Sequence, residues 1–356
     1  MNDPNLHAVQ GTAAPPRPTP LWIRIVIGLA AGVWGIALAL LRGRNVDDIK
    51  DFDQAWHAAR GLLAGVNPYD VVGPGRTFEW EWPLLYPLPA VLIAVPFSFV
   101  ELPVARMLFV AVSSALLAFA LSRDGYHRLV VFVSMAYLLA AVVAQWEILL
   151  SAAAILPFAG WALAAKPNVG LALFAAYPRK QALVGLIAIV TISLVIMPSW
   201  PGEWWKAIAN ATHIRPPITY AGGLFLLLAL LRWRRPEARL LAVLACTPHN
   251  IAPYALIPLF LIPATLAESL ILAWCTWIAK LMLDASRHGP WDSYDQMFAA
   301  NGTFFVPLVY LPALVMVLRR PNEGDVPDWA DRGLRKLFLR LPGRNRLLRS
   351  GTSHAQ

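Results

Sequence analysis

Long apolar runs dominate this chain of 356 residues and decide what it can fold into. The first run, residues 21–41, carries a single charge and at about 1.5 Å per residue is long enough to cross roughly 30 Å of hydrocarbon. It exceeds the apolar core of a signal peptide and no clear cleavage site follows it, so we expect it to be retained as a helix. The sequence therefore predicts an all-α polytopic membrane protein.

Composition agrees, because hydrophobic residues make up 58% of the chain and charged residues 14%, whereas roughly a quarter of residues in soluble proteins are charged. We expect a disordered cytoplasmic segment at residues 1–20, a transmembrane domain at 21–318 and a basic cytoplasmic tail at 319–356. Arg, Pro and Gly divide the apolar sequence into about twelve expected helices (roughly 10 to 13), several of them short enough to be broken or re-entrant. They lie near 21–41, 86–100, 105–121, 129–144, 147–165, 168–177, 181–197, 219–231, 238–247, 251–267, 268–285 and 303–318.

Basic residues predict the orientation. If the N-terminus is cytoplasmic and the helices alternate strictly, 18 of the 30 basic residues lie in or beside the inner segments, whereas Arg42, Arg44, Lys50, Arg123 and Arg128 are placed outside. The net charge of +9 owes much to the basic tail, which favours anionic lipid headgroups over nucleic acid. The same alternation brings the loop at 43–85, the break at 166–168 and the break at 248–250 to the outer face.

The loop at 43–85 is the most acidic part of the chain. It holds seven of the 21 acidic residues: Asp47, Asp48, Asp51, Asp53, Asp70, Glu79 and Glu81. Within it, Phe52, Trp56, Ala59 and Leu63 recur at helical spacing before Gly65 ends the pattern. We expect a short amphipathic helix on the membrane surface.

Asp51 stands at the start of this helix, and two interpretations remain open. With Gln54 three residues later it fits a helix-capping box. Alternatively, a carboxylate at the mouth of a membrane cavity can act as a general base. Asp53 is the competing candidate for that role.

Two later polar breaks are equally open. Lys166 interrupts a long apolar stretch, and a lysine there either extends to water or binds a lipid phosphate. His249, between Pro248 and Asn250, is either a helix-end histidine bonded to backbone or a donor to phosphate or sugar.

A series of short motifs runs in order along residues 51–260: Asp51-Phe52, Ala58-Ala59, Leu63-Ala64-Gly65, Asn67-Pro68-Tyr69, Tyr86-Pro87, Lys166-Pro167-Asn168, and Thr247-Pro248-His249 followed by Tyr254 and Pro258. Together they resemble the landmarks of glycosyltransferase family 87. These are bacterial integral membrane enzymes of the GT-C type that include polyprenol-phosphate-mannose-dependent mannosyltransferases. The resemblance implies a GT-C-type fold and Asp51 as catalytic base. It also implies Lys166 as a contact of the donor phosphate, and His249, Tyr86 and Asn168 as further substrate contacts.

The resulting hypothesis is an inverting hexosyltransferase, a mannosyltransferase by resemblance, in a bacterial inner membrane. Its donor is a polyprenyl-phosphate sugar, its acceptor a hydroxyl of a lipid or glycan, and its active site lies on the extracytoplasmic side among membrane lipids. Arg76 is expected to assist Lys166 at the phosphate. No metal or other cofactor is expected, because a polyprenyl monophosphate carries less charge than a nucleotide diphosphate and no HExxH-type spacing is present. A transporter or lipid flippase and a non-catalytic membrane subunit are the alternatives.

Overall fold

The computed structural model describes residues 19–42, 51–209, 214–287, 289, 291, 293–324 and 326. Asp47, Asp48, most of the predicted N-terminal segment and most of the predicted tail lie outside these residues. The regular elements of the described residues are all helical, and strand-like pairing among these residues is limited to two isolated bridges, Val72 with Phe78 and Arg215 with His249. The prediction of an all-α protein is therefore confirmed.

The α-helices, in chain order, are α1 (Leu21–Arg42), α2 (Asp51–Leu63), α3 (Leu88–Ala94), α4 (Leu102–Leu121), α5 (Met135–Val142), α6 (Glu147–Ile155), α7 (Pro167–Ala176), α8 (Lys180–Ile196), α9 (Trp200–Ala209), α10 (Pro236–Cys246), α11 (Leu266–Ala285), α12 (Tyr294–Phe305) and α13 (Leu311–Leu318). The 3-10 segments are η1 (Pro68–Asp70), η2 (Val95–Phe97), η3 (Ser122–Asp124), η4 (His127–Val133), η5 (Pro157–Ala165), η6 (Pro217–Thr219), η7 (Gly223–Arg232) and η8 (Pro253–Leu261). A π-helical turn, η9 (Val306–Tyr310), joins α12 to α13.

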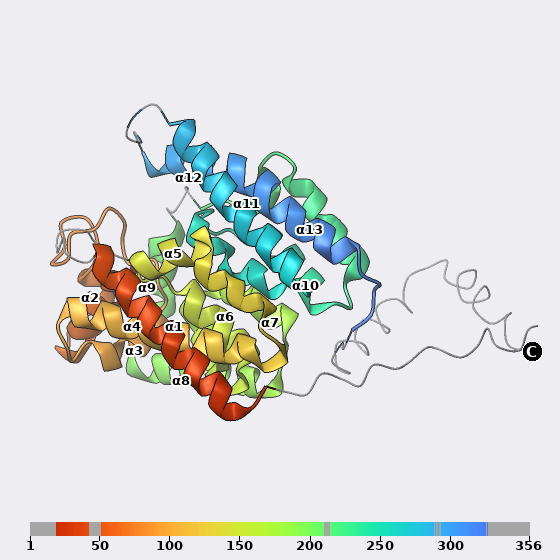
Figure 1. Cartoon of the computed structure of the whole chain (residues 1–356). Helices are drawn as coiled ribbons and strands as arrows, with labels where there is room; N and C mark the ends of the chain where they lie inside the picture. Colours follow the sequence, from red (N-terminus) through yellow and green to blue (C-terminus); the bar gives the residue numbers. More distant parts are fainter. Residues whose placement is uncertain are drawn as a thin grey trace, which may run out of the picture.

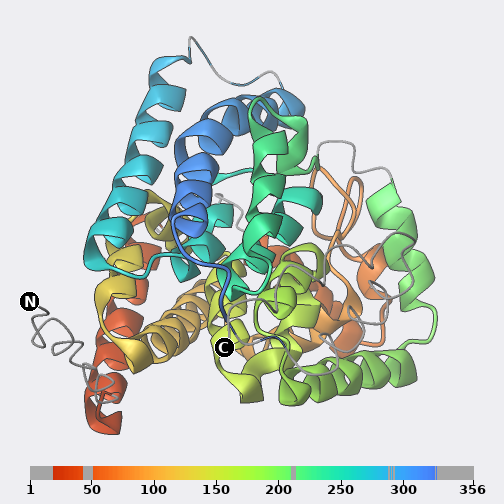
Figure 2. The ribbon, with the colours of Figure 1, turned by 90° about the vertical axis from the view of Figure 1, so that its right-hand side faces the viewer.

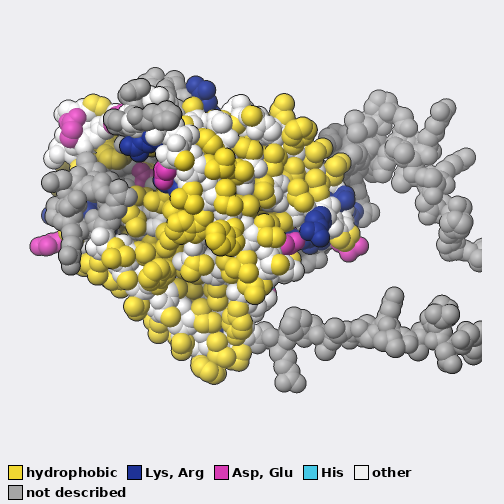
Figure 3. All heavy atoms as spheres, turned by 45° about the horizontal axis from the view of Figure 1, so that its top comes forward, with side chains coloured by type: hydrophobic (Ala, Val, Ile, Leu, Met, Phe, Trp, Pro, Cys, Tyr) yellow, Lys and Arg dark blue, Asp and Glu magenta, His cyan; other side chains and the backbone are white. Residues whose placement is uncertain are grey.

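Within the described residues, four helical stretches are long and apolar enough to cross a membrane: Leu21–Leu41, Leu102–Asp124, Leu266–Ala285 and Gln296–Leu318. Two bent pairs raise the number to six if each pair is one span: α5 with α6, bent by 115°, and α8 with α9, bent by 101°. Figure 2 shows α8 and α9 as two arms that meet near a right angle at one edge of the molecule. The space-filling view shows a broad hydrophobic face with charged side chains at its margins (Figure 3). These features are those of a membrane-embedded, multi-pass protein.

Prolines explain why many of the remaining helices are short. Proline lacks a backbone N–H and is tolerated in the first turn, so it begins a helix and prevents the preceding one from continuing. Proline occupies the first turn of η5, α7, α10 and η8. At about 1.5 Å per α-helical residue and about 2 Å per 3-10 residue, these segments and α5 and α6 are each roughly half as long as a bilayer core is thick.

These six half-length segments form three pairs, and the tips of all three pairs come together. The tips are the turn between α5 and α6 (residues 143–147), the break between η5 and α7 (Lys166), and the loop between α10 and η8 (residues 247–252). The main-chain N–H of Asp51 donates to the Val143 carbonyl (3.3 Å), which joins the start of α2 to the first tip. Within the hydrocarbon region of a membrane, non-helical backbone is tolerated where it is buried in protein or lines a cavity.

Opposite ends of the molecule differ in charge and in contacts. α2 and α9 lie at one end, which we call the cavity end, while the start of α1 and the end of α13 lie at the other (Figure 1). At this second end, which we call the arginine end, seven arginines of the described residues bond main-chain carbonyls beside helix ends: Arg24, Arg128, Arg179, Arg232, Arg235, Arg239 and Arg320.

Strict alternation of the helices is wrong at two places, and the two departures cancel. α3 with η2 is too short to cross a bilayer, and Phe97 at its end remains beside α2, where its carbonyl accepts from the Trp56 indole (3.2 Å). α4 therefore begins at the cavity end, and Arg123 and Arg128 reach the arginine end rather than the outer face. The expected helix at 147–165 is in turn two segments, α6 and η5, which restores the original sequence of faces before Lys166.

The amphipathic helix predicted after the first span is present as α2, but it does not lie free on the surface. Phe52, Trp56 and Ala59 of the apolar face are buried. The polar residues Asp53 and Gln54 are buried as well. Phe52 stacks on Phe109 of α4 with ring centroids 4.2 Å apart. The apolar face of α2 thus packs against α4 and η2 instead of lipid.

Candidate functional site

A cavity of about 420 Å³ lies at the meeting point of the helix tips. Its walls come from the start of α2, the segment before α3, the η5–α7 break, α9 and the loop after α10. The lining residues are Asp51, Gln54, Trp80, Trp82, Leu85, Tyr86, Pro87, Ala165, Lys166, Pro167, Asn168, Trp204, Ile208, Ile214, Pro248 and Asn250. The loop at 43–85 and the breaks at 166–168 and 248–250, which the sequence predicts on one face, therefore border one space.

Asp51 is held in this wall by three side-chain donors. Tyr86 donates its hydroxyl to Oδ2 (3.0 Å), Gln145 donates Nε2 to the same oxygen (2.5 Å), and Gln54 donates Nε2 to Oδ1 (3.1 Å). In a capping box Gln54 would accept from the Asp51 main-chain N–H, but that N–H donates to Val143 instead. Gln54 orients the carboxylate rather than capping the helix.

Tyr86 serves as a stable donor to Asp51. Burial raises the pKa of its hydroxyl well above 10.0, and the neighbouring Asp51 and Glu147 carboxylates raise it further. The phenol therefore stays protonated and keeps its hydrogen bond to Asp51 over the whole physiological pH range.

Lys166 projects from the η5–α7 break with 14% of its side chain exposed. Its ammonium donates to Oε1 of Glu147 (2.7 Å) and lies 5.8 Å from the centre of the Tyr254 ring. Glu147, the first residue of α6, is fully buried. An N-terminal position on a helix stabilises a carboxylate. The pair leaves ammonium hydrogens of Lys166 for a ligand in the cavity.

Asn168 and Asn250 complete the polar part of the wall. Asn168 donates Nδ2 to the Pro248 carbonyl (2.7 Å), and this contact ties the start of α7 to the loop after α10. The main-chain bridge between Arg215 and His249 holds Ile214 against the same loop. The Trp204 indole donates to the Leu85 carbonyl (2.9 Å), which fixes α9 as a side wall.

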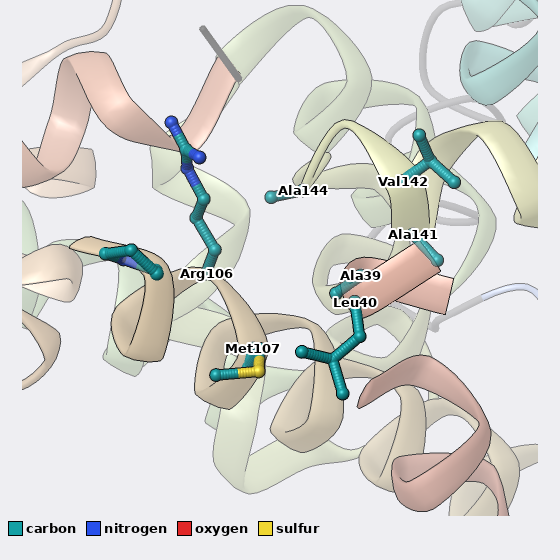
Figure 4. Close-up of a pocket in the computed structure, with 8 residues that line it drawn as sticks. Ala39, Leu40, Arg106, Met107, Ala141, Val142 and Ala144 are labelled. Carbon is teal, nitrogen blue, oxygen red and sulfur yellow. The ribbon is translucent and has the colours of Figure 1, made fainter. Parts of the chain in front are cut away.

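Asp53, the alternative base, faces away from the cavity. It is fully buried and bound by both Nε (2.8 Å) and Nη2 (2.5 Å) of Arg106. A second, much smaller hollow of about 40 Å³ borders this arginine between α1, α4 and α5. In Figure 4 the Arg106 side chain extends from α4 away from Leu40 and Met107. Because both oxygens of Asp53 are engaged by a buried guanidinium, its position is that of a structural ion pair.

Two other predicted substrate contacts lie outside the cavity lining. His249 is buried behind the wall, with Nδ1 2.8 Å from the Thr247 carbonyl and Nε2 3.0 Å from the Tyr310 hydroxyl. Arg76 is half-exposed on the loop and pairs with Asp70 (3.1 Å). His249 pairs with Arg215 in a strand-like bridge, and successive side chains of extended backbone point to opposite sides, so Pro248 and Asn250 line the cavity while His249 points inward.

Gln145 and Glu147 are site residues that the sequence analysis does not include. The sequence does contain a signal for Glu147, which is the only acidic residue between Asp124 and Glu203. Lys166 is likewise the only Lys or Arg between Arg128 and Arg179. A lone acid and a lone base in apolar sequence are expected to pair, because an isolated charge in the membrane is costly. Nothing comparable distinguishes Gln145.

Comparison of the chain with protein-family models, with curated proteins and with solved structures returned no match. The functional argument therefore depends on the chemistry of the cavity. That cavity combines a carboxylate with three donors, an ammonium that retains hydrogens for a ligand, several indole rings and an apolar side wall.

Proposed function

We propose that this protein is a membrane glycosyltransferase that moves a hexose, mannose by resemblance, from a polyprenyl-phosphate donor to a hydroxyl of a lipid or glycan acceptor. The observation that carries the proposal is that Asp51 and Lys166, which are 115 positions apart in the sequence, line one cavity at the meeting point of the helix tips. Such an arrangement supplies a base for an acceptor hydroxyl and a cation for a leaving phosphate. The proposed fold is of the GT-C type.

The reaction follows from the placement of these two groups. Asp51 accepts the proton of the acceptor hydroxyl as its oxygen attacks the anomeric carbon. The bond from that carbon to the phosphate oxygen breaks, and polyprenyl phosphate leaves with the electron pair on the face opposite to attack. Lys166 stabilises the charge that develops on the leaving phosphate. Attack from the opposite face inverts the configuration, and no metal or other cofactor is required by these steps.

Aromatic and apolar side chains support a sugar–lipid ligand. Trp80, Trp82 and Trp204 present indole rings to the cavity, and such rings combine a flat apolar face with a polar N–H, which suits a pyranose ring. Ile208 and Ile214 supply an apolar border toward which an isoprenoid chain can extend. A volume of about 420 Å³ lies within the range of small-molecule sites.

We further propose that the arginine end faces the cytoplasm of a bacterial inner membrane and the cavity end faces outward. Cytoplasmic ends of membrane helices are enriched in Lys and Arg. Arg123 and Arg128 strengthen this orientation, because the course of α4 brings them to the arginine end together with Arg24 and Arg179. The acceptor hydroxyl would then reach the site from the outer side.

The test is to incubate purified protein with labelled polyprenyl-phosphate mannose and a membrane lipid extract and to measure the transfer of label. Asp51→Asn removes the base and is expected to lower the rate by about 10²- to 10⁴-fold. Asp70→Asn is the matched control, because Asp70 lies in the same loop but pairs with Arg76 outside the cavity. Near-normal transfer by a folded Asp51→Asn protein would reject the assignment.

One observation favours a second function. Paired half-length helices with polar tips are also typical of transporters, where broken helices surround a central substrate site. A lipid-sugar flippase would move the labelled lipid across proteoliposome membranes without forming a new glycosidic bond. The same incubation, with product analysis and a leaflet-accessibility assay, separates the two, because a transferase yields labelled acceptor.

A further inference from the structure

The turn between α5 and α6 contacts both charged groups of the cavity. Gln145 in this turn donates to Asp51 (2.5 Å), and Glu147 two residues later accepts from Lys166 (2.7 Å). Ala144 between α5 and Gln145 has a positive φ of 49°, a conformation that residues other than glycine adopt rarely and at a cost. The tight turn thus places the Gln145 amide against Asp51 and the Glu147 carboxylate against Lys166.

Lys166 has two carboxylates within electrostatic reach. Glu147 is the stronger partner, and Asp51 is the second. Asp51 lines the cavity and Glu147 is fully buried beside it, and an ammonium gains more from a carboxylate in such surroundings than in bulk water. If Glu147 were neutral, Asp51 would be the remaining carboxylate available to Lys166.

We propose that Glu147 is a positioning residue that keeps Lys166 away from Asp51, so that the cation stays available for phosphate and the carboxylate for the acceptor proton. This inference deepens the proposed function and rests on it. Without Glu147, Lys166 pairs with Asp51, and each group blocks the other. Glu147 therefore separates two opposite charges that would otherwise neutralise one another within one cavity.

The first arm of the test measures binding rather than transfer. The probe is a short-chain polyprenyl phosphate without sugar, titrated against the purified full-length protein in detergent. Lys166→Gln is expected to raise the dissociation constant of this probe by about tenfold or more, which would establish the phosphate contact. Equal binding by Lys166→Gln and wild type would reject that contact of the proposed function, and the inference with it.

The second arm is a double-mutant cycle between Glu147 and Asp51. Glu147→Gln is expected to weaken binding by about tenfold, because Lys166 is captured by Asp51. In the Asp51→Asn background no competing carboxylate remains, so adding Glu147→Gln is expected to change binding by no more than about threefold. A role of Glu147 in fold integrity alone does not depend on Asp51.

Two outcomes overturn the inference while the phosphate contact stands. One is unchanged binding by Glu147→Gln, and the other is an equal loss in the wild-type and Asp51→Asn backgrounds. Should Glu147→Gln fail to fold, Glu147→Asp retains the charge with a side chain shorter by one methylene. It is expected to weaken binding by about threefold, and Asp51→Asn in that background is expected to reverse the loss. A loss that Asp51→Asn does not reverse would overturn the inference equally.

Discussion

The two ends of this molecule use charged residues differently. At the arginine end, guanidinium groups bond the carbonyls that helices leave unpaired at their C-termini, and in doing so they also oppose the negative end of each helix dipole. At the cavity end, the charges of Asp51, Glu147 and Lys166 are balanced by other side chains around a hollow. The charges at the arginine end stabilise the fold, whereas those at the cavity end lie within reach of a ligand.

Arg239 illustrates the first use. Its guanidinium donates to four carbonyls, those of Ala175 (2.8 Å), Ala176 (2.9 Å), Trp233 (3.1 Å) and Arg234 (2.7 Å). Lys166 illustrates the second, with a carboxylate on one side and the cavity on the other. The comparison predicts that substitutions at the arginine end lower stability, and that substitutions in the cavity wall lower binding or activity.

The largest expected effect on stability lies at the cavity end but outside the cavity. Asp53→Asn leaves the buried Arg106 charge uncompensated and is expected to lower the free energy of unfolding by about 3–5 kcal/mol. Asp51, two residues earlier, lines the cavity, so Asp51→Asn is expected to change stability far less. Thermal unfolding of both variants in the same detergent makes the comparison. A larger loss for Asp51→Asn would reverse the roles given to the two carboxylates.

Arg239→Gln tests the arginine end itself. The variant leaves two carbonyls at the end of α7 and two just after η7 without a charged donor, and we expect a loss of about 2–3 kcal/mol of unfolding free energy. The matched control is Arg234→Gln, because Arg234 is exposed, its guanidinium lies over the Trp233 ring, and its main-chain N–H contact to Asn322 survives the substitution. The control is expected to fall within about 0.5 kcal/mol of wild type. Equal losses in the two variants would show that carbonyl capping is not what Arg239 contributes.

Features that depend on local sequence could be predicted. The apolar run at 21–41 gives α1, the helical spacing after Asp51 gives α2, and prolines mark the breaks before α7 and after α10. The grouping of Asp51, Lys166 and Asn250 around one cavity is predicted by assuming that each helix crosses the membrane. Two segments depart from this assumption, α3 and the split helix at 147–165, but their effects on the predicted face cancel. A re-entrant segment differs from a span by only a few residues of apolar sequence, so hydropathy does not separate them.

Side-chain direction could not be predicted. Asp51 and Asp53 are two residues apart in one helix, and which of them faces the cavity depends on their distant partners, Gln145 in the α5–α6 turn for Asp51 and Arg106 of α4 for Asp53. His249 and Arg76 fail to reach the cavity for the same kind of reason, since Tyr310 and Asp70 hold them elsewhere. Sequence spacing fixes the face of a helix only after its neighbours are known.

The smallest expected effect is a pH dependence that arises beside the cavity rather than in it. His57 of α2 stacks on Phe78 with ring centroids 4.1 Å apart. Burial, together with the charges of Arg60 and Arg106, lowers the pKa of its imidazole from 6.5 to about 4. The unfolded chain therefore binds the proton more readily than the folded protein. The contribution of His57 to stability is complete above pH 6.5 and is lost as the pH falls toward about 4.

His57→Phe retains the ring stack but cannot be protonated. Between about pH 7 and about pH 4 its melting temperature should decline less steeply than that of wild type, while the two proteins should differ little in slope above pH 7. Thermal unfolding at a series of pH values measures both curves. Parallel curves throughout would mean that the acid sensitivity of this end originates in carboxylates, whose ion pairs are lost at low pH, and not in the histidine.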